Sequence, residues 1–266
     1  MDICGRPVAR ANPPSEPERE LINSPSAWAS TLPDVLDEAF PNSRAETRRA
    51  LLVAAGVRRF GVGHAILRQG DEGSLALVLE GHVAVRRTTD DGRQLIVRIV
   101  TRGGLASVLP LVARPATADA VALTPSPAAV WHGEDIRSLA MADSGLAVDI
   151  LDEVLLTFEE VMKRLDGLLH QNALRRVARV LATHADLFFA EPPVLSRSHL
   201  PTLVGTSREM TGRVLRVLES RQVIARVGRD RLLLLDPDGL AAAAELGGDR
   251  ARAARGTSSS SAALEQ

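Results

Sequence analysis

The amino-acid sequence predicts an α+β fold in three consecutive parts: a β-rich part, one long amphipathic helix, and a helical part that ends in a hairpin. Short apolar runs separated by glycine turns occupy residues 58–131, a strict apolar repeat follows Ser144, and helical periodicity with two closing strand-like runs extends from residue 173 to about 240. A length of 266 residues with 45% hydrophobic side chains is enough for one or two domains with substantial cores.

The composition excludes several classes of protein. One cysteine, Cys4, cannot build an internal disulfide framework or a four-cysteine zinc or iron–sulfur site. No apolar run approaches the ~18 residues of a membrane helix, and the N-terminus lacks a signal-peptide pattern. We therefore expect a soluble, cytoplasmic protein without a membrane partner. The net charge of −1 does not by itself indicate nucleic acid.

Both ends of the chain are predicted to be tails. Residues 1–30 hold several prolines among charged and small residues, and residues 241–266 become rich in alanine, arginine and then serine. Neither composition can build a core, so we expect disorder at both ends.

Residues 31–143 are predicted to form a β-barrel or sandwich, because turn signals recur every eight to twelve residues. Asp91-Gly92 is the strongest hairpin signal in the chain. The predicted strands include Ala65–Arg68, Leu75–Leu79, His82–Arg87, Leu95–Val100 and Ala120–Leu123.

Residues 144–172 are predicted to form a dimerisation helix. Apolar residues alternate at spacings of three and four between charged flanks, as in a two-stranded coiled coil. The alternative is a helix packed on its own domain, which usually shows a wider apolar face. The predicted interface consists of Leu151, Val154, Phe158, Val161, Leu165, Leu168 and, at the next core position, Asn172.

The order of elements after residue 173 is that of a winged helix–turn–helix. The predicted helices are Arg176–Phe189, Ser198–Val204 and Ser207–Arg221, and the predicted hairpin joins Val223–Val227 to Arg231–Leu235.

The second and third of these helices carry the signal for DNA binding. Gly205 permits a sharp turn, and Ser207 stands where a helix N-cap belongs. Arg208 and Glu209 then fall in the first turn, where a recognition helix meets base edges. Arginine donates two hydrogen bonds to guanine, and glutamate accepts from cytosine. Arg213 projects from a nearby face.

The local charge supports the same interpretation. Eight arginines against three acidic residues give +5 between positions 195 and 231, in a chain whose total is −1. Contacts with DNA phosphates require such a concentration of positive charge. The candidate DNA-contacting residues are Ser207, Arg208, Glu209, Arg213, Arg197, Thr206 and Arg216.

Several segments resemble the CRP/FNR family of bacterial transcription regulators. Residues 204–219 resemble its recognition motif, while Gln69-Gly70-Asp71, residues 78–85 and Asp91-Gly92-Arg93 are similar to its cyclic-nucleotide-binding β-roll. The resemblance covers residues 32–240. It implies a β-roll sensor domain, a dimerisation helix and a C-terminal winged helix–turn–helix.

The resemblance also implies partners and residue roles. It implies a homodimer on a near-palindromic double-stranded DNA site with TGTGA-type half-sites, and RNA polymerase as a further partner. Arg208, Glu209 and Arg213 match the base-reading positions of the family, and Ser207 and Arg197 match positions that hold phosphates.

The resemblance fails at the cyclic-nucleotide cassette, which in the family reads Gly-Glu-Leu and later Arg-Ser/Thr-Ala. This chain has Val108 at the place of the glutamate and Ala116 at the place of the arginine. A cyclic phosphate would lose charge-assisted bonds of roughly 1.5–3 kcal/mol each. We therefore expect no ordinary cAMP binding. The candidate ligand residues are Ser107, Val108, Thr117 and, as a substitute cation, Arg114.

No cofactor or metal site is predicted. Another nucleotide or haem stays open as an effector; haem would need an axial ligand, and none of the six histidines has a ligand-like spacing. Without an effector, the chain would bind DNA constitutively.

Two rival classes receive less support. The chain has no HExxH, GxSxG or P-loop motif, so we expect no enzyme and no catalytic residues. A nucleotide-sensing module that acts through protein contacts alone would not need the intact set Arg208, Glu209 and Arg213.

Overall fold

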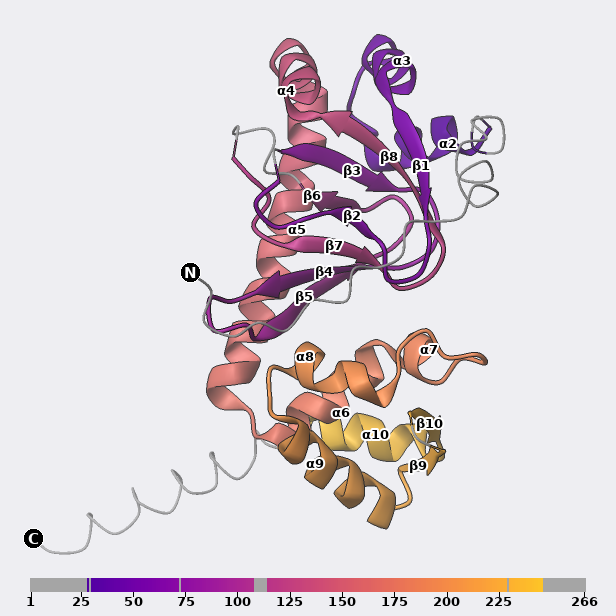
Figure 1. Cartoon of the computed structure of the whole chain (residues 1–266), viewed down its shortest axis with the longest axis vertical. Coiled ribbons are helices and arrows are strands. Elements are labelled where there is room, and N and C mark those ends of the chain that lie inside the picture. The colour runs from indigo at the N-terminus through magenta and orange to yellow at the C-terminus, as the bar shows by residue number, and fades with distance from the viewer. Residues whose placement is uncertain (1–27, 29, 72, 108–113, 229, 246–266) are drawn as a thin grey trace, which may run out of the picture.

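The computed structural model describes residues 28, 30–71, 73–107, 114–228 and 230–245. Figure 1 shows a β-roll, a long helix that runs along its side, and a smaller helical domain at the far end of that helix. This arrangement confirms the predicted α+β fold. Within the described residues, no helix is both long enough and apolar enough to span a membrane.

Two helices precede the strands. Helix α2 (Thr31–Ala39) buries Leu32, Val35 and Leu36, and α3 (Ala45–Ala54) buries Leu51 against the same core. Trp28 packs against this core as well. The prediction of a disordered tail up to residue 30 is therefore wrong for Trp28, whose large apolar side chain gains by burial. Residues 1–27 and 29 lie outside the described residues.

The β-roll consists of two four-stranded antiparallel sheets, in the orders β1-β8-β3-β6 and β2-β7-β4-β5. All five predicted strands are present. Strands β1, β6 and β8 were not predicted, because their residues lack a clear alternating pattern. The strands are β1 (Gly56–Phe60), β2 (Ala65–Leu67), β3 (Ser74–Val78), β4 (Val83–Thr88), β5 (Gln94–Val100), β6 (Leu105–Ser107), β7 (Asp119–Ala122) and β8 (Ser126–His132).

Strands β4 and β5 form the predicted hairpin. Gly92 adopts φ +77°, which a glycine tolerates without steric cost. The pairing shifts between Val85 and Arg86, so that Val97 is an extra residue on β5 and forms a β-bulge. Strand β5 is also the edge strand of its sheet.

Helix α4 (Gly133–Ala142) leads into α5 (Ser144–His170), which has 27 residues. Asp143 caps α5 by accepting from the amide of Gly145 at 3.0 Å. The buried Asp149 accepts from the amides of Asn42 and Ser43 at 3.1–3.2 Å. The contacts of Asp149 fix the start of α5 against the loop between α2 and α3.

Helix α5 ends before the predicted boundary at residue 172. Asn172 instead caps α6 (Ala173–Thr183) and accepts from the amide of Arg175 at 2.9 Å. The assignment of Asn172 to a core position of the long helix is therefore wrong. Asparagine favours an N-cap because its side-chain oxygen can satisfy an amide that the helix leaves free.

The C-terminal domain has the predicted helices and hairpin with different boundaries, followed by a helix, α10, that was not predicted. The expected helix at 176–189 is divided at His184, and the helix after residue 237 extends to Glu245. The expected tail from residue 241 is therefore wrong as far as 245, because Ala243 is buried and α10 packs on α6. The other elements are α7 (Ala185–Phe188), the 3₁₀ helix η3 (Arg197–His199), α8 (Leu200–Val204), α9 (Arg208–Ser220), β9 (Ile224–Val227), β10 (Arg231–Leu234) and α10 (Pro237–Glu245).

Candidate DNA interface and effector cavity

The turn between α8 and α9 has the predicted geometry. Gly205 ends α8 in the left-handed conformation at φ +68°. The hydroxyl of Ser207 accepts from the amide of Met210 at 3.1 Å, so the predicted cap is present. Thr211, Val214 and other residues on one side of α9 are buried, which holds its opposite side toward solvent.

The base-reading candidates occupy the exposed side of α9. Arg208, Glu209, Arg213 and Arg216 are all exposed. Arg213 and Glu209 form an ion pair at 2.6 Å one helical turn apart. Such a solvated pair contributes little stability. Both side chains can therefore exchange this contact for hydrogen bonds to base edges.

A basic groove lies beside these residues, between α8, α9 and the hairpin β9–β10. Four members of the candidate set line it together: Arg197, Arg208, Glu209 and Arg216. The amide of Arg197 donates to the carbonyl of Asp230 at 2.9 Å and fixes η3 against the hairpin turn. Thr206, Ser207 and Arg213 lie outside the groove lining. A groove lined by several guanidinium groups suits a phosphate backbone.

Arg226 also lines this groove, and the sequence-based set lacked it. It pairs with Glu219 at the far end of α9. Its signal in the sequence was only its place among the eight arginines between residues 195 and 231, since no motif singles it out.

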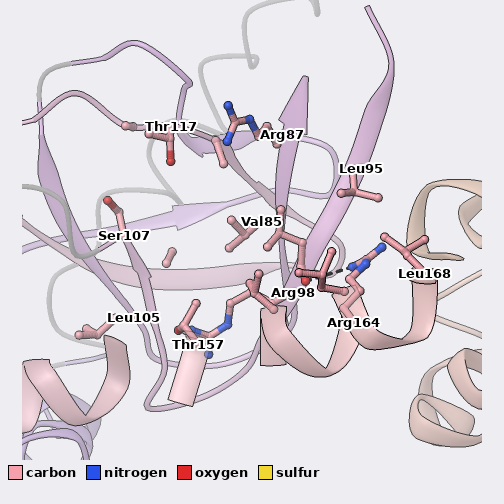
Figure 2. Close-up of a pocket in the computed structure, with 16 residues that line it drawn as sticks. Val85, Arg87, Leu95, Arg98, Leu105, Ser107, Thr117, Thr157, Arg164 and Leu168 are labelled. Carbon is pink, nitrogen blue, oxygen red and sulfur yellow. Dashed lines mark hydrogen bonds between the residues drawn. The ribbon is translucent and has the colours of Figure 1, made fainter. Parts of the chain in front are cut away.

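A second cavity, of about 430 Å³, lies between the sheet β2-β7-β4-β5, strand β6 and helix α5 (Figure 2). Of the predicted ligand residues, Ser107 and Thr117 line it. Arg114 is exposed and does not line it, and Val108 lies outside the described residues. Arg114 is therefore not a substitute cation in this arrangement.

Ala116, at the place where the family has a phosphate-binding arginine, is held by hydrogen bonds of its own backbone. Ala116 is buried; its amide donates to the carbonyl of Asp71 at 3.1 Å, and its carbonyl accepts from the amide of Gly70 at 2.7 Å. The small side chain therefore offers the cavity an apolar wall.

Three arginines in the cavity wall were missed by sequence reasoning: Arg87, Arg98 and Arg164. Arg98 binds Glu153 of α5 at 3.0 Å and donates to the hydroxyl of Thr157. Arg164 donates to backbone carbonyls, and burial lowers the pKa of its guanidinium. No sequence motif marks these arginines, because their position depends on how β4, β5 and α5 pack.

The described lining of the cavity contains no Asp, Glu, His or Cys side chain. This described part of the lining therefore offers neither a carboxylate for a ribose hydroxyl nor an axial ligand for haem. Elsewhere in the described part of the chain, no group of three His, Cys, Asp or Glu residues is placed to hold a metal ion.

Helix α5 presents an apolar face that the described residues of this chain leave exposed. The six predicted seam residues on α5 are exposed by 36–58%. Leu155 and Leu169 are exposed as well, so the apolar face is wider than a strict seam. Val161, Leu165 and Leu168 also border the cavity. One face of α5 therefore joins the predicted interface to the cavity wall.

Comparisons with known proteins agree with this architecture. Residues 57–143 match the cyclic nucleotide-binding domain family, and residues 175–243 match the Crp-like helix-turn-helix domain family. No curated protein sequence matches the chain.

Solved structures of CRP/FNR-type regulators share the fold. The c-di-GMP-responsive global regulator CLP of Xanthomonas campestris is 22% identical, with 72% of this chain and 99% of that chain covered and a TM-score of 0.62. A CRP/FNR family transcriptional regulator of Thermus thermophilus is 24% identical, with 73% and 100% covered and a TM-score of 0.61. FixK2 of Bradyrhizobium japonicum is 16% identical, with 71% and 96% covered and a TM-score of 0.59.

At these identities the structural likeness shows the fold, and the two domain families are matched in their expected order along the chain. Together with the β-roll, the long helix and the helix–turn–helix described above, these findings show that the chain belongs to the CRP/FNR family of transcription regulators.

Proposed function

We propose that the chain is a homodimeric transcription regulator that reads a near-palindromic DNA site through α9 and does not respond to cAMP through the family cassette. One observation carries the proposal: Arg208, Glu209 and Arg213 are exposed at the start of a capped helix that borders a groove lined by arginines. The N-terminal residues of a recognition helix meet base edges, while neighbouring cations hold phosphates.

The candidate residues divide into those that would contact bases and those that would contact phosphates, according to their position on the domain. Arg208 and Arg213 would donate to guanine and Glu209 would accept from cytosine, as TGTGA-type half-sites require. Ser207, Thr206, Arg197 and Arg216 would contact phosphates, and Arg226 joins them because it lines the groove with Arg197 and Arg216.

Dimerisation would occur through the exposed face of α5. A soluble monomer rarely leaves a row of Leu, Val and Phe side chains open to water, and Leu151, Val154 and Phe158 form such a row. A second copy on this face would pair two α5 helices. Two α9 helices would then enter major grooves about 34 Å apart on one side of the DNA. RNA polymerase is the proposed further partner, and the cytoplasm the proposed location.

The cavity supports two versions of regulation. Ala116 at the arginine position and the absence of a carboxylate from the described lining support DNA binding without cAMP. Arg87, an exposed arginine in the cavity wall, supports a different anionic effector. The c-di-GMP-responsive relative makes c-di-GMP a compound to test.

The test is fluorescence anisotropy of the purified chain on a TGTGA-type inverted repeat and on scrambled DNA, with and without cAMP and c-di-GMP. We expect specific binding without nucleotide. Arg208→Ala should weaken it, whereas Arg49→Ala, which removes an exposed arginine of α3, should not. Binding that requires cAMP would overturn the statement on the cassette. If random-sequence selection also yields no preferred DNA site, the DNA-reading role fails.

A further inference from the structure

The helix–turn–helix domain docks on the β-roll through the contact between α8 and strand β5 (Figure 1). Ile96 and Ala84 of the β-roll are buried in one apolar cluster with Leu200 and Leu203 of α8. At the edge of this contact stands Arg164, which extends from α5 toward β5 (Figure 2). Three separate segments of the chain therefore meet around one guanidinium.

On the β-roll side, Arg164 binds carbonyls at the bulge of an edge strand. Its Nη1 donates to the carbonyls of Ile96 and Val97, the latter at 3.1 Å. Val97 is the bulged residue, and a bulge disrupts the regular pairing of backbone groups. An edge strand also has no neighbour on its outer side. The guanidinium therefore supplies donors where the sheet has none.

On the other side, Arg164 binds the carbonyl end of α8. Its Nη2 donates to the carbonyls of Thr202, at 3.3 Å, and Leu203. The last carbonyls of a helix have no partner within it. The amides of Gly205 and Thr206 both donate to Pro201 instead. A cation at this end is favourable because the carbonyl end of a helix is partially negative.

The shape of arginine suits this position. The guanidinium is a planar fork whose two terminal nitrogens can point at separate acceptors, whereas a lysine ammonium is a single point of charge. No carboxylate forms an ion pair with Arg164 among the residues that the structure describes. Burial lowers the pKa of the group, but an arginine keeps its proton in proteins. Its donors are thus committed to two domains.

We propose that Arg164 is a positioning residue that locks the helix–turn–helix domain onto strand β5 and so sets the place of α9 relative to α5. The proposal rests on the proposed function, since α9 is the DNA-reading helix in that function. Only the turn at residues 205–207 separates α8 from α9, so fixing the end of α8 fixes the start of α9. Arg164 also forms part of the cavity wall, which places the lock beside the space that a ligand would fill.

The test compares hydrogen–deuterium exchange in the full chain and in three variants, without DNA. Arg164→Met removes all donors and keeps the length of the side chain. Arg164→Lys keeps the charge. Arg98→Met is the matched control, because Arg98 joins the same strand to the same helix through Glu153 and Thr157 and does not bind α8.

We expect amides of α8 and β5 to exchange about tenfold faster in Arg164→Met, because several charge-assisted hydrogen bonds are lost. Arg164→Lys should fall between this variant and the unmodified chain. In Arg98→Met, α8 should exchange at the unmodified rate. Amides of α6 and β3 lie in the two separate cores and should keep their protection in Arg164→Met.

Three results would overturn the lock: unchanged exchange of α8 and β5 in Arg164→Met, an equal effect of Arg98→Met on α8, or a loss of protection that extends to α6 and β3. The last result would mean that Arg164 supports folding as such. If Arg164→Met behaves as expected while the unmodified chain binds no specific DNA, the lock stands and the proposed function fails.

Discussion

The two arginine-rich regions of the molecule differ in what surrounds their guanidinium groups. In the groove beside α9, Arg208 and Arg216 are exposed and their neighbour Arg213 pairs only with a solvated glutamate. In the β-roll cavity, Arg98 is 14% exposed and bound to Glu153, and Arg164 is bound to backbone carbonyls. Solvated side chains are free to bind a new partner, whereas enclosed ones already hold the structure together. The same residue type is therefore available for a new partner in one region and serves the architecture in the other.

The largest effect should come from Phe158→Asp, which tests whether a single DNA-binding domain is sufficient for tight binding. A charge on the exposed apolar face of α5 should prevent pairing, since an unpaired charge cannot be buried cheaply. Sedimentation should show a monomer, and affinity for an inverted repeat should fall by about a hundredfold or more, because the second half-site loses its effective concentration.

Met141→Asp is the matched control for this change. Met141 is 81% exposed on α4 and lies outside the apolar face of α5. It should leave both mass and affinity unchanged. If the Phe158→Asp variant still sediments as a dimer, the proposal that α5 forms the dimer interface is wrong.

The next effect should separate recognition from stability in the groove. Arg208→Ala should cost ~1–3 kcal/mol of binding to the preferred site and relax selection at one base pair. Its unfolding midpoint in urea should not change, because the side chain is exposed. Equal losses on specific and random DNA would show that Arg208 contacts only the backbone.

The opposite pattern is expected for Arg98→Met in the cavity. Removing charge-assisted bonds to Glu153 and Thr157 should lower the free energy of unfolding by about 1.5–3 kcal/mol. Arg213→Met, whose side chain is 61% exposed, should change it by less than about 0.5 kcal/mol. Urea titration of both variants measures the contrast. Equal stabilities would contradict the architectural role of Arg98.

The smallest expected effect is the dependence of stability on pH, which should differ between the DNA-binding domain and the β-roll. In the DNA-binding half, burial lowers the pKa of His184 and His199 below the ordinary value of 6.5. The unfolded chain then binds more protons, so stability falls as the pH drops below 6.5. His199→Asn, which keeps an acceptor for the amide of Ser196, should reduce this dependence.

In the β-roll half, stability should be lost only at lower pH, because the group involved is a carboxylate. The hydroxyl of Thr47 and the amide of Arg44 lower the pKa of Asp143 below 3.8. Its contribution is present above 3.8 and is lost as the pH falls through its lowered folded value. Domain-resolved hydrogen exchange should therefore show the DNA-binding half opening first on acidification. Simultaneous opening would show that the halves unfold as one unit.

Local sequence signals were sufficient for much of the fold. The Asp91-Gly92 turn, the left-handed Gly205 and the Ser207 cap were predictable because each depends on a few neighbouring residues. The end of α5 and the existence of α10 were not. Asn172 fits both a heptad core position and an N-cap, and alanine-rich residues 241–245 fit both a tail and a packed helix.

What the sequence by itself determined about this protein is the set of local structures and the positive charge of the segment around α9. Short-range rules fix these, since neighbouring residues interact in any environment. Only the tertiary structure decided which arginines line the cavity and which side chain joins the domains. Arg164 reaches Ile96 across 68 residues of sequence and Thr202 across 38. Such contacts depend on the packing of three elements at once, which periodicity and spacing along one chain do not specify.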